Sequence, residues 1–381
     1  MTITGKNFAT TTSGNVVQFN GVNASLNSAT ANQLVAVVPT GDVDGKIKVT
    51  VGTEMATSTQ DFTLKEPEEQ LADVYAAGYY YNGSFSAMYW KNDVEIVLEE
   101  GESSAESIYV SNEDDVYVGG HRYLNGVKTG TVWKNNEIYL SLSNEQNETN
   151  ITSIYVKSDG TLYSAGTIRI DGIRTATVWE DGEVLYSMNE FGDNSQAESI
   201  VVDGTDVLVG GREFDPNWGV YLARIWKNGQ VIHQLGDFSE SRVWDLCLHN
   251  DEILASGEET IDDEDDYKGA MVWKNSGTLY TLNKAKENAV GFAIGVTLDG
   301  AIITAGYEKE NNSRFATYWN NSNAITIGSE GSQIMDLFIK NNDKYFGGVQ
   351  GNAAIVWKNE GVLFSFAAEN WEKRVNSIFV K

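Results

Sequence analysis

A short phrase built around a tryptophan and a tight turn occurs seven times in this sequence, and it constrains the fold more than any other feature. Clear copies are TGTVWKNNEIYL at 129–140, TATVWEDGEVL at 175–185 and GAMVWKNSGTLY at 269–280. The tryptophans of the phrase follow one another at intervals of 38 to 47 residues: Trp90, Trp133, Trp179, Trp226, Trp273, Trp319 and Trp357. A period of this length predicts an architecture of stacked repeats.

Two further motifs accompany each tryptophan. The first is a short apolar run such as SIYV at 107–110, and the second ends in a small residue and a glycine, as in VYVGG at 116–120. The tryptophan strand and the strand after its turn complete a unit of four short strands. Seven such units predict an all-β fold with a seven-bladed β-propeller, in which the repeated tryptophans pack between blades.

The two ends of the series predict how the ring closes. The first unit begins at its second strand, VYAAG at 74–78, and no apolar run of the first kind precedes it. The chain ends with SIFVK at 377–381, which is a first strand without a unit to follow. We therefore expect the C-terminal strand to complete the first blade and to leave no open sheet edge.

Residues 1–64 have a different pattern, in which alternating strands such as NVVQFNG (15–21) and KIKVTV (46–51) predict a small β-sandwich. Through ITGKNF (3–8), VQFNG (17–21) and LVAVVPTGDVDGKIKVTV (34–51), this segment resembles the IPT/TIG domain, an immunoglobulin-like module. The opening strand usual in that family is missing, which suggests N-terminal truncation. We interpret the acidic segment 65–73 as a linker, and 74–381 as the propeller.

The repeats also resemble the propeller repeats of secreted bacterial surface proteins, which often stand beside IPT/TIG modules in polysaccharide-using bacteria. This resemblance implies an extracellular or cell-surface location, with the signal segment outside this chain, and a binding role. It supplies no established site residues.

The net charge is −27 and the isoelectric point is about 4.4, which argues against nucleic acid as a partner because phosphate binding needs a basic surface. A single cysteine, Cys247, excludes internal disulfides. No run of apolar residues is long enough to insert into a membrane.

In a propeller, the loops from second to third strand and from fourth strand to the next blade emerge on one face, here called the mouth face; the other turns form the turn face. Three tryptophans outside the repeated phrase, Trp218, Trp244 and Trp371, are expected on the mouth face. Seven of the eight arginines are expected there too: Arg122, Arg169, Arg174, Arg212, Arg242, Arg314 and Arg374. Lysines instead occupy turns of the turn face, as at Lys134.

Exposed tryptophans stack on sugar rings, and the planar fork of arginine suits a carboxylate or sulfate. The pattern therefore favours binding of a polysaccharide or oligosaccharide, acidic sugars included. The alternative left open is that the arginines pair with acidic residues of the same loops. The predicted ligand-binding residues lie in a long loop at 212–223, at the start of the neighbouring inner strand, and elsewhere on the mouth face. They are Arg212, Phe214, Trp218, Tyr221, Arg242, Trp244, His121, Arg122, Arg169 and Trp371.

We predict a non-catalytic protein, since the common hydrolase and metalloprotease motifs are absent. A protein-interaction or adhesion scaffold on the same face, with another surface protein as partner, is the alternative. A polysaccharide lyase or glycosidase is a third possibility, because Glu106 and Glu198 could form a carboxylate pair. No cofactor is expected: Asp262, Glu264 and Asp266 could gather Ca²⁺, but a solvated loop explains them better.

Overall fold

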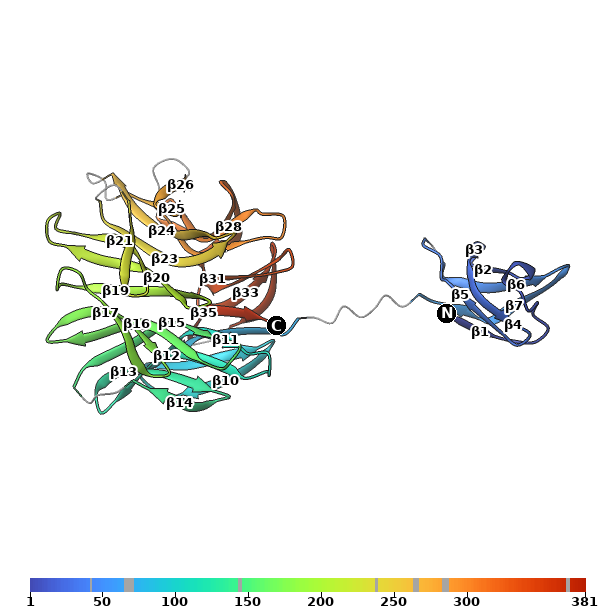
Figure 1. Cartoon of the computed structure of the whole chain (residues 1–381), viewed down its shortest axis with the longest axis horizontal. Helices are drawn as coiled ribbons and strands as arrows, with labels where there is room; N and C mark the ends of the chain where they lie inside the picture. The colour runs from blue at the N-terminus through green and yellow to red at the C-terminus, as the bar shows by residue number, and fades with distance from the viewer. Residues whose placement is uncertain are drawn as a thin grey trace. The chain divides into compact units, whose positions relative to one another are not determined.

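The structure is a computed structural model that describes residues 1–41, 43–64, 72–142, 146–236, 239–262, 267–282, 288–367 and 371–381, without the side chain of Asp262. The chain divides into two compact units, Met1–Leu71 and Ala72–Lys381 (Figure 1). Within these described ranges, no helix is long and apolar enough to cross a membrane.

The first unit is a sandwich of two antiparallel sheets. Alternate strand residues point inward, so that Val17, Phe19, Leu34, Ile47 and Val49 are buried between the sheets. One sheet has the order β1 (Thr2–Thr4), β5 (Gln33–Ala36) and β4 (Leu26–Thr30). The other has the order β3 (Val22–Ala24), β2 (Val16–Phe19), β6 (Gly45–Val51) and β7 (Glu54–Phe62), and a short 3-10 turn, η1 (Thr12–Gly14), precedes β2. The predicted immunoglobulin-like sandwich is confirmed.

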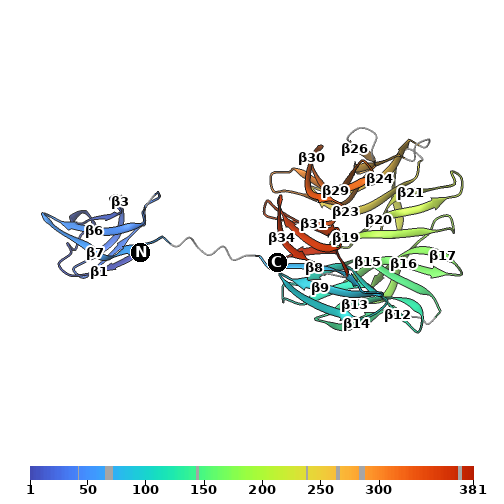
Figure 2. The ribbon, with the colours of Figure 1, turned by 180° about the vertical axis from the view of Figure 1, so that it is seen from behind.

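The second unit consists of seven four-stranded antiparallel blades arranged in a ring (Figures 1 and 2). Blade 2 contains β11 (Ser103–Val110), β12 (Val116–Leu124), β13 (Val127–Lys134) and β14 (Glu137–Ser141). Blade 3 contains β15 (Glu148–Val156), β16 (Leu162–Ile170), β17 (Ile173–Glu180) and β18 (Glu183–Met188). Blade 4 contains β19 (Ser195–Asp203), β20 (Asp206–Asp215), β21 (Val220–Lys227) and β22 (Gln230–Leu235). Blade 5 contains β23 (Ser241–His249), β24 (Glu252–Asp262), β25 (Tyr267–Lys274) and β26 (Gly277–Thr281). Blade 6 contains β27 (Ala289–Val296), β28 (Ile302–Glu310), β29 (Ser313–Asn320) and β30 (Asn323–Glu330). Blade 7 contains β31 (Ser332–Lys340), β32 (Asp343–Gln350), β33 (Ala353–Lys358) and β34 (Gly361–Phe366).

Blade 1 joins the two ends of the ring. The C-terminal strand β35 (Glu372–Val380) pairs with β8 (Val74–Tyr81), in register from Val380 opposite Val74 to Glu372 opposite Tyr81, and the sheet continues through β9 (Phe85–Lys91) and β10 (Val94–Glu99). Figure 2 shows the C-terminus beside β8. The predicted closure by the last strand, and with it the count of seven blades, is confirmed.

The seven repeated tryptophans lie between blades, as predicted. None is more than 2% exposed. Each packs on the preceding blade: Trp133 of blade 2 belongs to the same buried cluster as Tyr75 and Ala87 of blade 1, and Trp90 of blade 1 packs with Tyr345 of blade 7. The same contact therefore continues across the closure.

The glycine that ends the second-strand motif is required by a close approach between strands. The innermost strand of blade 2 has a bulge between Ala105 and Ser107, which turns the carbonyl of Ser104 toward β12. A Cβ atom at Gly120 would lie 2.1 Å from that carbonyl oxygen, and one at Gly166 would lie 1.9 Å from the carbonyl oxygen of Asn150. Only glycine fits there.

A belt of hydrogen bonds between innermost strands holds neighbouring blades in register. The N–H of Ile154 donates to Ser107 Oγ of the preceding blade at 3.1 Å, and the N–H of Ile378 donates to Asp336 Oδ2 at 2.8 Å. The N–H of Ile108 donates to Ser377 Oγ at 3.3 Å and carries the belt across the closure. Serine or aspartate recurs at this position, but the recurrence alone does not predict its role in the belt.

Candidate functional site

The segment 212–223, expected as a long loop, is a β-hairpin. Strands β20 and β21 stay paired until Asp215 lies opposite Val220, and only a tight turn connects them. A buried charge network lies in this hairpin: Arg224 is 3.4 Å from a carboxylate oxygen of Glu213 and 3.6 Å from one of Asp215. Trp218 lies in the turn and is 56% exposed. The hairpin therefore presents this indole from a braced support.

The two arginines predicted at the centre of the site already have partners in the protein. The guanidinium of Arg212 lies 4.4 Å from the centre of the Tyr221 ring, and its Nε donates to Gln196 Oε1 at 2.9 Å. The guanidinium of Arg242 lies 3.4 Å from the ring centre of Trp244 and forms an ion pair with Glu198. Arg212 also lies 3.6 Å from a carboxylate oxygen of Glu240. Both arginines are thus paired within the protein, but Glu198 and Glu240 lie outside the loops of the arginines they pair with.

The remaining aromatic candidates also make internal contacts. Phe214 meets Tyr221 edge to face, with ring centres 5.4 Å apart. Trp371, which directly precedes β35, stacks on Tyr80 at 5.4 Å while 44% of the residue stays exposed. Its partly exposed ring remains available to a ligand.

A cavity of about 170 Å³ opens on the mouth face where blades 2, 3 and 4 meet. We call it the cationic cavity because its lining residues include three cations and one carboxylate: Lys128, Arg169, Arg174, Glu148, Thr149, Asn150, Thr167 and Gln196. The sequence analysis selected Arg169 but missed Lys128. The sequence contained a signal for Lys128, because this residue lies next to a turn between second and third strands and not among the lysines in turns of the turn face.

The cations of this cavity are not fully neutralised by the protein. Arg169 forms an ion pair with Glu148 at 3.2 Å. Neither Lys128 nor Arg174 has an acidic partner within ion-pair distance among the residues described. Burial lowers the pKa of Lys128, and the nearby carboxylates of Glu106 and Glu148 oppose that shift. Burial of the charged Lys128 ammonium costs free energy, and binding of an anionic ligand would offset that cost.

Two buried polar side chains, Asn150 and His121, lie in and beside the cavity. Asn150 Oδ1 and His121 Nδ1 have no hydrogen bond of standard geometry in the described part of the chain, although the Asn150 side chain interacts with His121 and opposes the fall of its pKa. That Nδ1 atom lies 3.9 Å from the Glu106 carboxylate. Burial lowers the pKa of His121 to about 3, with Lys128 adding to the shift, so the imidazole is neutral near pH 7. Buried polar atoms without partners are sites at which a ligand or water can bind.

The cationic cavity continues toward the predicted aromatic group. Gln196 lines the cavity and accepts the hydrogen bond from Arg212, which in turn stacks on Tyr221. Arg122 lies farther round the ring, with Nη1 3.9 Å from Glu99. The structure thus brings Arg169 and Arg212 together through Gln196.

The carboxylate pair considered for catalysis lies at equivalent bulges of two innermost strands. Desolvation raises the pKa of Glu106, whose Oε2 accepts a hydrogen bond from Asn376 at 3.0 Å. Glu198 is paired with Arg242. For calcium, Glu264, Asp266 and the side chain of Asp262 lie outside the described residues. Across the described ranges, no cluster of three or more histidine, cysteine or acidic side chains has the geometry of a metal site.

Residues 1–65 match the family model described as IPT/TIG domain. The N-terminal unit is an IPT/TIG domain. The IPT/TIG match ends before the first strand of the propeller, which resembles solved structures instead. A search of curated proteins finds no match to the chain.

Among solved structures, the β-propeller domain of the Trilobed protease from Pyrococcus furiosus, described as having an open velcro topology, is 12% identical, with a TM-score of 0.51; the match covers 78% of this chain and 97% of that one. An auxiliary nutrient binding protein from Bacteroides ovatus is 12% identical over 91% of this chain and 90% of its own, with a TM-score of 0.33. A protein of unknown function from Bacteroides thetaiotaomicron has the same identity and coverage, with a TM-score of 0.37. The likeness to the Pyrococcus furiosus domain concerns the fold alone.

Proposed function

We propose that this protein binds an acidic polysaccharide or oligosaccharide on the mouth face of its propeller, without cleaving it, at the surface of a cell or outside it. The observation that carries the proposal is the cationic cavity, whose lining includes Lys128, Arg169 and Arg174 but only one carboxylate, Glu148. The chain as a whole has a net charge of −27. A local excess of positive charge in so acidic a protein favours an anionic ligand at that point.

The lining chemistry suits a sugar that bears a carboxylate. Guanidinium groups bind carboxylates through two parallel hydrogen bonds, and the Lys128 ammonium adds a point charge. Asn150, Thr167 and Gln196 offer donors and acceptors to hydroxyl groups. At about 170 Å³ the cavity is smaller than the roughly 300–1,000 Å³ typical of drug-sized ligands, so it suits one residue of a longer chain.

The exposed aromatic rings extend the same surface. Because Gln196 connects the cavity wall to Arg212 and Tyr221, a glycan anchored in the cavity can continue along the blade 4 hairpin toward Trp218. Trp218 is 56% exposed, and its indole is of the kind that sugar rings stack on. The IPT/TIG domain then serves as a spacer.

The test is binding of the full chain to polygalacturonate, with its methyl ester as the neutral control, measured by calorimetry. Lys128→Met and Arg174→Gln are each expected to weaken polygalacturonate binding about tenfold, near 1.4 kcal/mol. Lys134→Met is the matched control, since that lysine lies on the turn face in an ion pair with Asp115 at 2.8 Å. Equal binding of the acid and the ester, or equal loss in the control, would contradict the proposal.

The same assay separates the other functions. Release of shortened sugars would favour a glycosidase or lyase, with Glu106 and Glu198 as the carboxylate pair; Glu106→Gln would then abolish release. Failure to retain any acidic glycan would favour the protein-interaction scaffold.

A further inference from the structure

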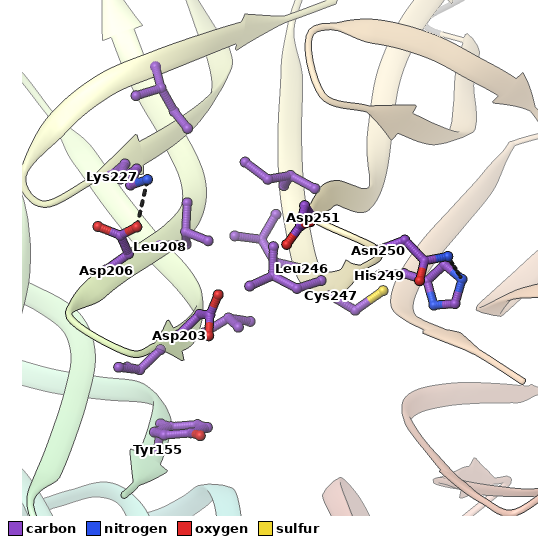
Figure 3. Close-up of a pocket in the computed structure, with 15 residues that line it drawn as sticks. Tyr155, Asp203, Asp206, Leu208, Lys227, Leu246, Cys247, His249, Asn250 and Asp251 are labelled. Atoms are coloured by element: carbon purple, nitrogen blue, oxygen red, sulfur yellow. Dashed lines mark hydrogen bonds and ion pairs between the residues drawn. The ribbon is translucent and has the colours of Figure 1, made fainter. Parts of the chain in front are cut away.

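A second and larger cavity, of about 670 Å³, opens on the turn face between blades 4 and 5. Figure 3 shows its lining side chains, with Tyr155 on one side of the opening and Cys247 on the other. Its volume falls in the range of small-molecule sites. The sequence analysis placed no ligand on this face.

The cavity exists because the repeat changes at one position of the innermost strands. Tyr109, Tyr155, Phe338 and Phe379 occupy this position in four neighbouring blades and contact one another in series, with ring centres 4.8 to 5.9 Å apart. The other three blades have small side chains at the equivalent position: Val201, Cys247 and Gly295. Aromatic rings therefore fill this part of the interior in blades 1, 2, 3 and 7, and the cavity opens beside Val201 and Cys247. At Gly295 the side chain of Ile339 occupies the space instead.

The walls of this cavity combine apolar, aromatic and acidic groups. Val201, Leu208 and Leu246 supply apolar surface, and Tyr155 supplies an aromatic ring. Asp203 and Asp251 line the cavity with no ion-pair partner among the described residues, whereas Asp206 is paired with Lys227 at 2.7 Å (Figure 3). Two unpaired carboxylates and an aromatic ring in the lining of one cavity attract a cation, and the apolar surface favours an attached hydrophobic body.

Two polar side chains of the cavity play no reactive part in this interpretation. Burial raises the pKa of the Cys247 thiol to about 12, so it stays protonated and acts as a small apolar group. His249 Nε2 lies 2.8 Å from Nδ2 of its neighbour Asn250. The site therefore has the chemistry of recognition and not of covalent catalysis.

We propose that the turn-face cavity binds an organic ammonium or guanidinium group attached to an aromatic or aliphatic body. A free amine and a basic side chain of a peptide share this chemistry. The site is independent of the mouth face, and its ligand has the opposite charge to the acidic glycan.

The test measures binding of two probes to the full chain by calorimetry: phenethylamine and the blocked dipeptide acetyl-Phe-Arg-amide. The anion 3-phenylpropionate is the matched control ligand. Val201→Tyr introduces the residue that blades 2 and 3 already carry and should reduce binding more than tenfold by filling the cavity. Asp203→Asn combined with Asp251→Asn leaves the cavity open and should weaken binding about tenfold, with an unchanged melting temperature.

Binding of phenethylamine alone would assign the site to free amines, and binding of the dipeptide alone would assign it to peptides. The proposal is overturned if neither probe binds, if 3-phenylpropionate binds as well as the amines, or if both sets of variants bind normally. Lys128→Met, which tests the mouth face, should leave binding of both probes unchanged. Failure of one site is thus distinguishable from failure of the other.

Discussion

Replacement of Ile378 by alanine tests whether the C-terminal strand holds the ring together. Ile378 is 3% exposed and lies in the cluster that joins blades 1 and 7, together with Trp90 and Tyr345. Its N–H also donates to Asp336, one link of the belt between innermost strands. If the ring is closed here, damage to this strand lowers the stability of the whole propeller.

The expected cost follows from burial. Truncation of a buried isoleucine to alanine typically costs about 2–5 kcal/mol. Removal of 372–381 would take away three buried apolar side chains, Val375, Ile378 and Val380. At roughly 1.5–3 kcal/mol each, this loss approaches the 5–15 kcal/mol by which whole domains are stable. The truncated chain should also aggregate, because β8 becomes an open sheet edge.

Urea denaturation followed by tryptophan fluorescence is a selective assay. All ten tryptophans lie at or after residue 90, so the signal reports on the propeller and not on the IPT/TIG domain. Leu298→Ala is the matched control, because Leu298 is 78% exposed. Equal midpoints for Ile378→Ala and Leu298→Ala, or an unchanged midpoint after truncation, would refute the closure argument.

Three further predictions concern the packing and electrostatics of the propeller. Trp179 is 2% exposed, and Trp179→Ala should cost about 3–5 kcal/mol of stability. Trp218 is 56% exposed, and Trp218→Ala should leave the melting temperature unchanged and weaken glycan binding by roughly 1–2 kcal/mol. The reverse result would show that Trp218 is the packing residue and Trp179 the binding residue. Gly120→Ala should destabilise by about 1–3 kcal/mol in urea titrations because its Cβ meets the Ser104 carbonyl at 2.1 Å, and a neutral effect would show that the bulge can move. Burial raises the pKa of Asp336 to about 7, so folding favours its protonated form and its contribution to stability falls as the pH rises from about 4 to 7. Asp336→Asn should therefore gain stability relative to the native chain across that window, by at most about 4 kcal/mol, and a constant difference between pH 4.5 and 8 would contradict this.

The sequence by itself determined the architecture of the propeller. Repetition makes the packing problem local: each blade buries the same tryptophan on its neighbour, so spacing and motif order suffice to predict seven blades. The complementary ends of the chain, VYAAG and SIFVK, predict the closure because an unpaired strand edge is costly. The exposed Trp218 was also identifiable, as an aromatic residue outside the repeat.

Only the tertiary structure decided which polar groups meet. Lys128, Arg174 and Gln196 come from three blades, and their spacing in the chain does not show that they share one cavity. Likewise, the pairing of Arg242 with Glu198 crosses a blade boundary. Electrostatic free energy depends on distance and burial in three dimensions, neither of which a repeat period contains. The turn-face cavity also depends on tertiary structure, since Val201 and Cys247 come from two blades and line one cavity only when those blades lie side by side.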